Sequence, residues 1–303
     1  MRSSACIAPI AEQQLGLVAR HQLLDEGMSA STLDSILASG RLVPIERAVY
    51  RVPGAPETPW TRLLAKVLAC GPGSMISHRS AAWLWELCDA PVRHEISVPR
   101  DRRLRRPDLV VHESTDLQLA NPGTVHGVPV TGVGRTILDC AGDPGVDVEL
   151  LIDAARRVHR ISRTLLPHVA VTHARSGRRG INRLRSLLEL DDLPHSDFER
   201  LVWRWLDDQG VTGWVRHHHL VLPGYGAVEV DVAWPDLCIA LELEGGDHID
   251  RSAVHDNDTW RQNRLVLGRW LIVRCTYRRW LREADAVLDE ITGAIAVRSA
   301  ERR

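Results

Sequence analysis

The sequence predicts a multidomain protein that combines the α+β and α/β classes. Its 303 residues are enough for two or three domains. Hydrophobic residues make up 44% and charged residues 25%, an ordinary balance for a chain that folds around buried cores. Segments with the 3.6-residue period of amphipathic helices occur together with segments that alternate every second residue, as half-buried strands do. Both helices and sheets are therefore expected.

The first domain, residues 1–55, is predicted to contain helices followed by a β-hairpin. Apolar residues at helical spacing run from 10 to 27. Ser29 can cap a second helix over 29–39, and residues 41–53 alternate as a short hairpin does. Short helices followed by a hairpin within ~50 residues indicate a winged helix-turn-helix, with the last helix as the candidate reader of a DNA groove.

We expect the second helix and the hairpin of this domain to contact DNA. The exposed helix positions carry hydroxyls and no arginine, so they offer little positive charge for phosphate binding. The hairpin arginines offer more. The candidate DNA-binding residues are Ser31, Thr32, Arg41, Arg47 and Arg51. A winged-helix fold that serves packing or protein contact is the alternative interpretation.

A short set of residues in this domain gives a resemblance to a known family. The set is Gln22-Leu23-Leu24, Gly27, Gly40-Arg41-Leu42 and Val49-Tyr50, with Ala48 where a glycine is usual. In this order the residues resemble the N-terminal domain of AbiEi-type antitoxins, which are winged-helix DNA-binding proteins that repress their own promoters. The resemblance implies DNA and a cognate toxin as partners, within a type IV toxin–antitoxin system.

Residues 56–190 are predicted to form a mixed α/β middle region. The patterns predict helices at 60–70, 77–87 and 147–160 and strands at 94–99 and 109–112. An arginine cluster between the two strands is interpreted as a solvated loop, with nucleic-acid contact as the alternative. The segment 128–141 resembles the middle segment of actinobacterial AbiEi-like proteins, and in it Thr131, Arg135 and Thr136 are expected to serve turns and helix caps.

Two alternating runs nearer the end of the chain carry opposed carboxylates. The runs, 228–233 and 239–244, are each expected to be a half-buried strand. If Pro235 to Cys238 form the turn, Asp231 lies directly across from Glu242, ~5 Å away. Two carboxylates that close repel each other unless a cation lies between them, and hard oxygen ligands suit Mg²⁺ or Mn²⁺. A solvated polar face on an edge hairpin is the alternative.

The third domain, residues 191–303, is predicted to place this hairpin in a mixed sheet beside a helix. The helix begins at Ser196, and Glu199 either completes a capping box with that serine or looks toward the sheet. A strand at 215–222 precedes the hairpin, and its three histidines are interpreted as structural. A crossover helix and a last strand at 270–275 follow the hairpin, which makes the sheet mixed.

The acids of this domain and their neighbours form an ordered set. The set is Ser196-x-x-Glu199, Val230-Asp231-x-Ala233-Trp234-Pro235, Glu242-Leu243-Glu244-Gly245, His248, Asp258-x-x-Arg261 and Gly268-Arg269-Trp270. In this order it resembles the PD-(D/E)XK nuclease superfamily, and more narrowly a family of unknown function related to the very-short-patch-repair endonuclease. The resemblance implies a restriction-endonuclease-like mixed sheet with flanking helices.

The same resemblance implies metal-dependent hydrolysis of phosphodiester bonds. Asp231 and Glu242 would hold Mg²⁺ or Mn²⁺ with help from Glu199. The metal would lower the pKa of its water and stabilise the charge that builds on the scissile phosphate.

Three further residues receive catalytic roles from the resemblance. Glu244 occupies the position of the superfamily's lysine, which removes the usual partner of the attacking water. His248 is the candidate general base in its place. Arg261 is expected either to hold the phosphate or to pair with the acids.

We expect the whole chain to be a cytoplasmic, metal-dependent DNA endonuclease guided by its N-terminal DNA-binding domain. The six scattered cysteines indicate neither a cysteine zinc site nor a disulfide framework. No apolar stretch suits a signal peptide or a membrane span. The alternative is a non-catalytic DNA-binding antitoxin or transcriptional repressor with a degenerate nuclease fold. The net charge of −1 favours neither of them.

Overall fold

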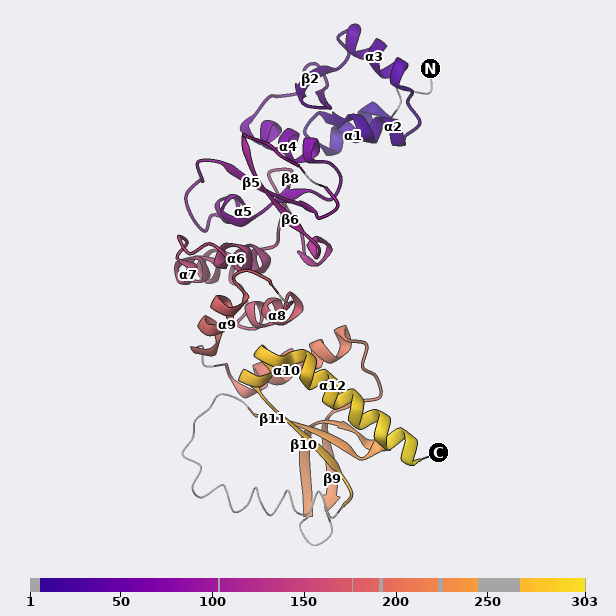
Figure 1. Cartoon of the computed structure of the whole chain (residues 1–303), viewed down its shortest axis with the longest axis vertical. Coiled ribbons are helices and arrows are strands. Elements are labelled where there is room, and N and C mark those ends of the chain that lie inside the picture. Colours follow the sequence, from indigo (N-terminus) through magenta and orange to yellow (C-terminus); the bar gives the residue numbers. More distant parts are fainter. Residues whose placement is uncertain are drawn as a thin grey trace. The chain divides into compact units, whose positions relative to one another are not determined.

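The computed structural model of the chain describes most of its residues. The described ranges are 6–102, 104–175, 177–190, 193–222, 226–244 and 268–302. They form a mixed α/β protein, which confirms the predicted class, and the chain divides into two compact units, Met1–Ile161 and Ser162–Arg303 (Figure 1). No helix in the described ranges is long and apolar enough to cross a membrane.

Short helices and a three-stranded antiparallel sheet make up the start of the first unit. In chain order they are α1 (Ile7–Gln13), β1 (Leu17–Ala19), α2 (Arg20–Asp25), α3 (Ala30–Ala38), β2 (Val43–Glu46) and β3 (Val49–Arg51). The strands lie in the order β1-β3-β2. The predicted second helix and hairpin are confirmed. Ser29 caps α3 because its Oγ accepts a hydrogen bond from the N–H of Thr32 (3.1 Å).

The prediction of one helix from 10 to 27 is wrong. The chain turns at Gly16 (φ 81°), and Leu17–Ala19 then pairs with β3 as a strand. Val18 packs into the core formed by the three short helices, whereas its two neighbours pack into a second core with α4 (Pro59–Cys70). Because both faces of this strand are buried, the sequence shows no alternation that would distinguish it from a helix.

A five-stranded mixed sheet and its helices form the rest of the first unit. After α4 come β4 (Met75–Ile76), α5 (His78–Leu84), β5 (His94–Pro99), β6 (Leu109–Ser114), β7 (Gly123–Val125), β8 (Val128–Val130), α6 (Val133–Ala141) and α7 (Val148–His159). The strand order is β6-β5-β4-β8-β7, with β5–β6 and β4–β8 parallel. The helices and strands predicted between 60 and 112 are confirmed, although α5 ends three residues early.

A four-stranded mixed sheet organises the second unit. The elements are α8 (Leu165–Thr172), α9 (Ile181–Leu190), α10 (His195–Asp208), β9 (Val215–Leu222), β10 (Gly226–Trp234), β11 (Ile239–Glu244), β12 (Leu271–Thr276) and α12 (Tyr277–Glu301). β9, β10 and β11 are antiparallel and β12 runs parallel to β11, which confirms the predicted mixed sheet. Trp234 pairs with Ile239, so the turn comprises Pro235 to Cys238 as predicted.

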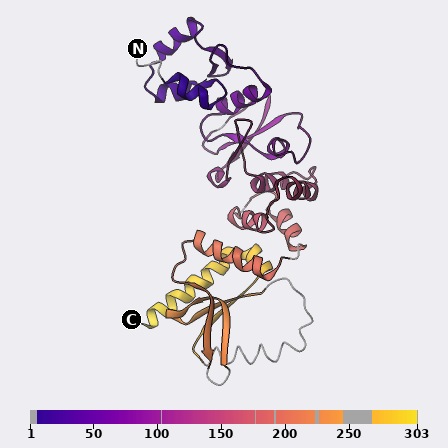
Figure 2. The same cartoon turned by 180° about the vertical axis from the view of Figure 1, so that it is seen from behind.

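The long helix α12 was not predicted from the sequence. Trp280, which is fully buried, packs edge-to-face against Phe198 and Trp205 of α10, with ring centroids 6.0 and 6.1 Å apart. α10 and α12 therefore lie side by side over the sheet, as Figure 2 shows. α12 also contacts α8 and α9. These contacts explain why the compact units divide after Ile161, and not near the predicted boundary at 191.

Candidate metal centre

Three polar side chains from α10 and β10 meet in the second unit. His195 and Glu199 are one turn apart on α10, and Asp231 lies on β10. One ligand atom from each side chain lies within 4.8 Å of the other two, and His195 Nδ1 is 3.6 Å from Glu199 Oε1. Residues at i and i+4 share one face of a helix, which accounts for the first pair. Two carboxylates and an imidazole can together hold a divalent metal.

The start of α10 determines which way Glu199 points. The N-cap is Pro194, which makes no side-chain cap hydrogen bond, and His195 is the first helical residue. Ser196 therefore lies inside the helix, and the predicted capping box with Glu199 is wrong. Glu199 is only 7% exposed. The geometry matches the other interpretation of this residue, in which its carboxylate looks toward the sheet.

Asp231 and His195 are both anchored to the backbone of Leu243. The β10–β11 ladder pairs Val232 with Leu241. Beyond that pair, the N–H of Leu243 donates to Asp231 Oδ2 (2.7 Å), and its carbonyl accepts from His195 Nε2 (2.8 Å). Because a carbonyl only accepts, Nε2 must carry a proton, which leaves Nδ1 as the metal-binding nitrogen of the neutral ring. Such backbone contacts are typical of histidines that bind metals.

A row of histidines and glutamates continues from Glu199 along β9 and β10. His217 Nδ1 lies 3.9 Å from Glu199 Oε1 and 3.1 Å from Glu229 Oε1. The other oxygen of Glu229 lies 3.0 Å from His219 Nε2. His217 has a left-handed backbone (φ 46°) within its strand. The histidines interpreted as structural thus include two that lie beside carboxylates.

The electrostatics of this group favour a bound cation. Burial raises the pKa of Glu199, and the charges of Asp231 and Glu229 raise it further, whereas His195 and His217 lower it. A buried acid whose neighbours are also acids is costly to ionise. A cation between Glu199 and Asp231 would offset that cost.

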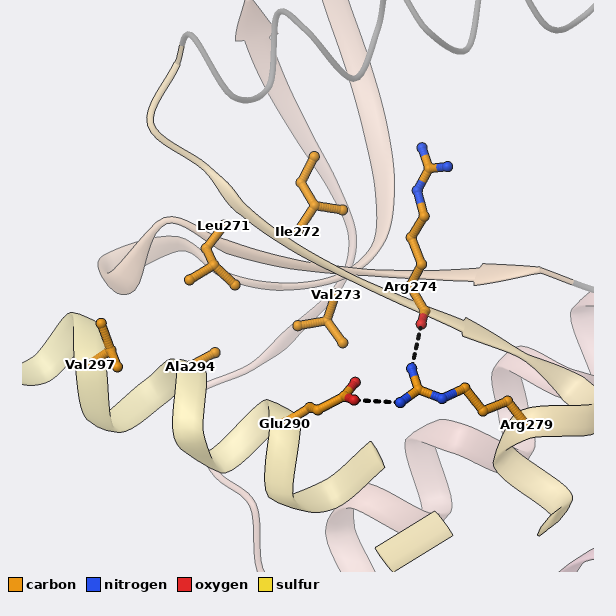
Figure 3. A pocket seen from close by; sticks show the side chains of 8 residues that line it. All are labelled: Leu271, Ile272, Val273, Arg274, Arg279, Glu290, Ala294 and Val297. Carbon is orange, nitrogen blue, oxygen red and sulfur yellow. Dashed lines mark hydrogen bonds and ion pairs between the residues drawn. The ribbon is translucent and has the colours of Figure 1, made fainter. Parts of the chain in front are cut away.

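Glu242 and Glu244, both predicted to act in the site, instead pair with Arg274 of β12. The guanidinium lies 3.6 Å from Glu242 and 3.9 Å from Glu244. Figure 3 shows the Arg274 side chain pointing away from α12 and from the Arg279–Glu290 ion pair. Arg274 thus supplies positive charge beside Glu242, its cross-strand neighbour, and the sharing of one cation by Asp231 and Glu242 stays a prediction.

Two predicted site residues cannot be placed, and two residues of the site were not predicted. His248 and Arg261 lie outside the described residues. His195, which the sequence reasoning missed, lies four residues before Glu199 on the same helical face, and that spacing was the available signal. Arg274 was also missed. In the parallel pairing of β11 and β12 it lies directly opposite Glu242.

The five candidate DNA-binding residues of the first unit differ in their exposure and in the hydrogen bonds that they already make. Arg41 is exposed just after α3, and Arg47 is exposed at the hairpin tip. Arg51 is half-buried, and its Nη1 donates to the carbonyl of Ala55 (2.6 Å), so it is less available than the other two arginines. The hydroxyls of Ser31 and Thr32 both bond to the capping serine of α3, at 3.0 and 2.8 Å.

No family model matches the chain, and no match was found among curated proteins. Function is therefore inferred from the geometry of the two units.

Proposed function

We propose that the second unit is a metal-dependent DNA endonuclease whose metal is held by Glu199, Asp231 and His195. The observation that carries this proposal is that one ligand atom from each of the three side chains lies within 4.8 Å of the other two. Asp231 is held there by the N–H of Leu243 on β11, which donates to its carboxylate. The mixed strand order β12-β11-β10-β9, with an acid supplied from a neighbouring helix, supports the resemblance to PD-(D/E)XK nucleases.

The donor atoms fit a small divalent cation. Carboxylate oxygens suit Mg²⁺ and Mn²⁺, and an imidazole nitrogen shifts the preference toward transition metals. We therefore expect Mn²⁺ to bind more tightly than Mg²⁺. The contacts of His195 and Asp231 with the Leu243 backbone fix both ligands before any metal arrives.

The chain supplies the groups that hydrolysis needs around the metal. A bound Mn²⁺ or Mg²⁺ would lower the pKa of water and stabilise the charge on the scissile phosphate. His217, between Glu199 and Glu229, is placed to accept a proton. Arg274 adds a positive charge beside Glu244, which occupies the position of the missing motif lysine.

The test is cleavage of supercoiled plasmid DNA by the full chain as Mn²⁺ is titrated, with EDTA as the metal-free control. Glu199→Gln keeps the size of the side chain and removes its charge. We expect metal affinity to fall by roughly 100-fold or more, since a direct ligand is worth at least as much as its outer support. Glu283→Gln, an exposed carboxylate on α12, is the matched control and should cleave normally. Wild-type cleavage by Glu199→Gln at every Mn²⁺ concentration would rule out this metal centre.

A non-catalytic role in DNA binding and repression is the second candidate. It is favoured by the first unit, where α1-β1-α2-α3-β2-β3 with strand order β1-β3-β2 supports the winged-helix, AbiEi-like resemblance. DNA is the partner that this arrangement implies, and a cognate toxin would follow from the antitoxin resemblance.

We expect Arg47→Ala to weaken DNA binding without changing sequence preference. Loss of one phosphate contact should reduce the slope of log affinity against log salt by about 1. Gel shifts in EDTA on the DNA upstream of the coding region would measure this. Arg62→Ala removes an exposed arginine that pairs with Glu57 and serves as the control. An unchanged slope for Arg47→Ala would remove the hairpin from the DNA contact.

A further inference from the structure

A second group of possible metal ligands lies in the first unit, on the five-stranded sheet. His112 of β6 pairs with Ser97 of the parallel strand β5, and Glu95 is two residues earlier on β5. Alternate residues of a strand share one face, so these side chains lie on the same side of the sheet. His78, the first residue of α5, stacks on His112 with ring centroids 3.5 Å apart.

The polar atoms of this group converge. Glu95 Oε2 lies 2.8 Å from His112 Nε2, and one ligand atom from each of His78, Glu95 and His112 lies within 4.8 Å of the other two. All three residues are half-buried. Neither this group nor its elements belong to the metal centre of the second unit.

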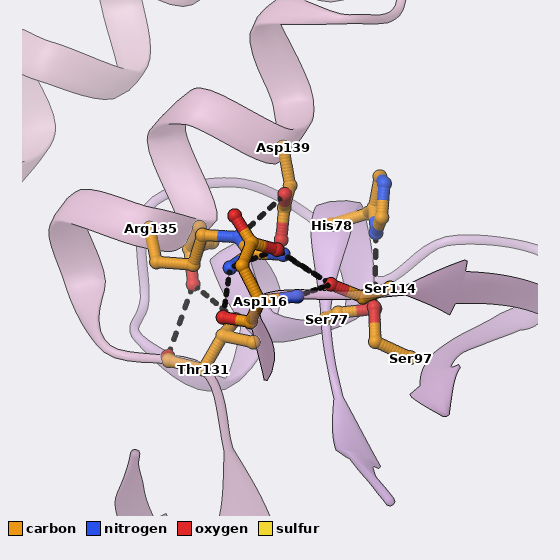
Figure 4. Close-up of polar contacts among 9 residues, drawn as sticks. Ser77, His78, Ser97, Ser114, Asp116, Thr131, Arg135 and Asp139 are labelled. Carbon is orange, nitrogen blue, oxygen red and sulfur yellow. Dashed lines mark hydrogen bonds and ion pairs between the residues drawn. The ribbon is translucent and has the colours of Figure 1, made fainter. Parts of the chain in front are cut away.

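Neighbouring groups hold the remaining polar atoms of two of these side chains. Glu95 Oε1 accepts from the N–H of Arg79 (3.2 Å). His78 Nδ1 lies 3.0 Å from Ser77 Oγ, and Ser77 Oγ in turn accepts from Ser97 (2.8 Å), as Figure 4 shows in part. This leaves Nε2 of His78 for a ligand, whereas Oε2 of Glu95 becomes available only when its hydrogen bond with His112 is displaced. The contacts with Ser77 and with the Arg79 N–H are the outer support that metal-binding histidines and carboxylates usually have.

We propose that His78, Glu95 and His112 form a Zn²⁺ site in the first unit. Two imidazoles and one glutamate are a known zinc ligand set that leaves a fourth position open. With bonds of roughly 2.0–2.2 Å, tetrahedral ligand atoms lie about 3.3–3.6 Å apart. The 2.8 Å contact between Glu95 Oε2 and His112 Nε2 must therefore widen when a metal binds. The proton of the hydrogen bond between these two atoms is displaced by the metal. The planes of the His78 and His112 rings are within 14° of parallel. Because an imidazole binds a metal in the plane of its ring, one ring must turn before both can bind the same ion.

The experiment measures metal binding by the full chain carrying Asp231→Asn, so that the centre of the second unit does not contribute. Protein stripped with EDTA is titrated with Co²⁺, which reports its coordination by visible absorption, and then with Zn²⁺ in competition. We expect one equivalent to bind and the melting temperature of the first unit to rise with Zn²⁺. Adding His112→Ala should weaken binding by roughly 100-fold or more, since a direct ligand is worth at least as much as its outer support.

The matched control is His126→Ala, which removes another stacked histidine of the same unit, one that packs on Trp60. It should bind the metal normally. If His112→Ala does not fold, Glu95→Gln decides the question, because the amide keeps the size of the side chain and loses the charge. Absence of Co²⁺ and Zn²⁺ binding in the Asp231→Asn protein, or binding that survives both His112→Ala and Glu95→Gln, would overturn the proposal and leave a hydrogen-bonded histidine stack.

Discussion

Replacing Arg135 with Ala is expected to lower the free energy of unfolding of the first unit by about 3–5 kcal/mol. Arg135 is 3% exposed. Its Nε donates to Asp139 Oδ1 (2.8 Å), its Nη2 donates to Ser114 Oγ (3.1 Å), and its Nη1 lies 3.3 Å from Asp116 Oδ1 (Figure 4). Both aspartates are 8% exposed. Removing the guanidinium leaves two buried negative charges without the cation that compensates them.

Hydrogen exchange resolved by peptide would measure this loss in the first unit separately from the second. Arg157→Ala, an exposed arginine on α7, is the matched control and should change stability by less than about 0.5 kcal/mol. Combining Arg135→Met with Asp116→Asn and Asp139→Asn should recover part of the loss, because the buried charges are then gone. A loss below about 1 kcal/mol for Arg135→Ala would mean that water or rearrangement solvates the acids.

The Arg135 network shows a limit of reasoning from local sequence. Thr131 and Thr136 do serve the turn that was predicted for them, since Thr136 Oγ1 donates to the carbonyl of Thr131 (3.0 Å). Arg135 between them has the same local context but reaches Asp116, which is 19 residues away in the chain. No periodicity encodes a partner at that separation, so the ion pair with Asp116 could be found only from the fold, whereas the pair with Asp139 has the i, i+4 spacing of helix neighbours.

Several strands were predictable from their sequence patterns, whereas β1 and α12 were not predicted. The bounds predicted for β5 and β11 and the turn at Pro235 to Cys238 are confirmed, whereas β10 extends beyond its predicted run, 228–233, at both ends. β1 was missed because Leu17, Val18 and Ala19 are all buried. α12 was missed although its buried residues Trp280, Ala284, Val287, Ile291 and Ala294 recur at helical spacing, which was an available signal.

The candidate site was predictable in its acids and not in its histidines. The pattern placed Glu199 on a helix and Asp231 on a strand, and the resemblance to nucleases, not the pattern, brought the two acids together. His195 was concealed by a plausible cap at Ser196, and His217 depends on a left-handed backbone in mid-strand. The role of Glu242 as a metal ligand stays a prediction, and its cross-strand neighbour on β12, Arg274, was not predicted.

Replacing Asp231 with Asn is expected to reduce DNA cleavage by on the order of a thousandfold, provided that the second unit is the proposed nuclease. A metal contributes several kcal/mol of transition-state stabilisation, and each 1.36 kcal/mol is tenfold in rate. The asparagine oxygen can still accept the N–H of Leu243, so the strand contact made by Asp231 Oδ2 is retained. The melting temperature should therefore stay close to that of the wild type while single-turnover cleavage in Mn²⁺ is lost.

Asp231→Ala separates this catalytic effect from a structural one. Alanine removes the metal ligand and also leaves the Leu243 N–H without its acceptor at a half-buried position, which costs about 1–3 kcal/mol. We expect both variants to lose cleavage equally and only the alanine variant to melt at a lower temperature. Loss of cleavage in Asp231→Ala alone would mean that Asp231 acts by joining β10 to β11 and not by binding metal. Full cleavage by both variants would exclude this carboxylate from the chemistry and favour the repressor.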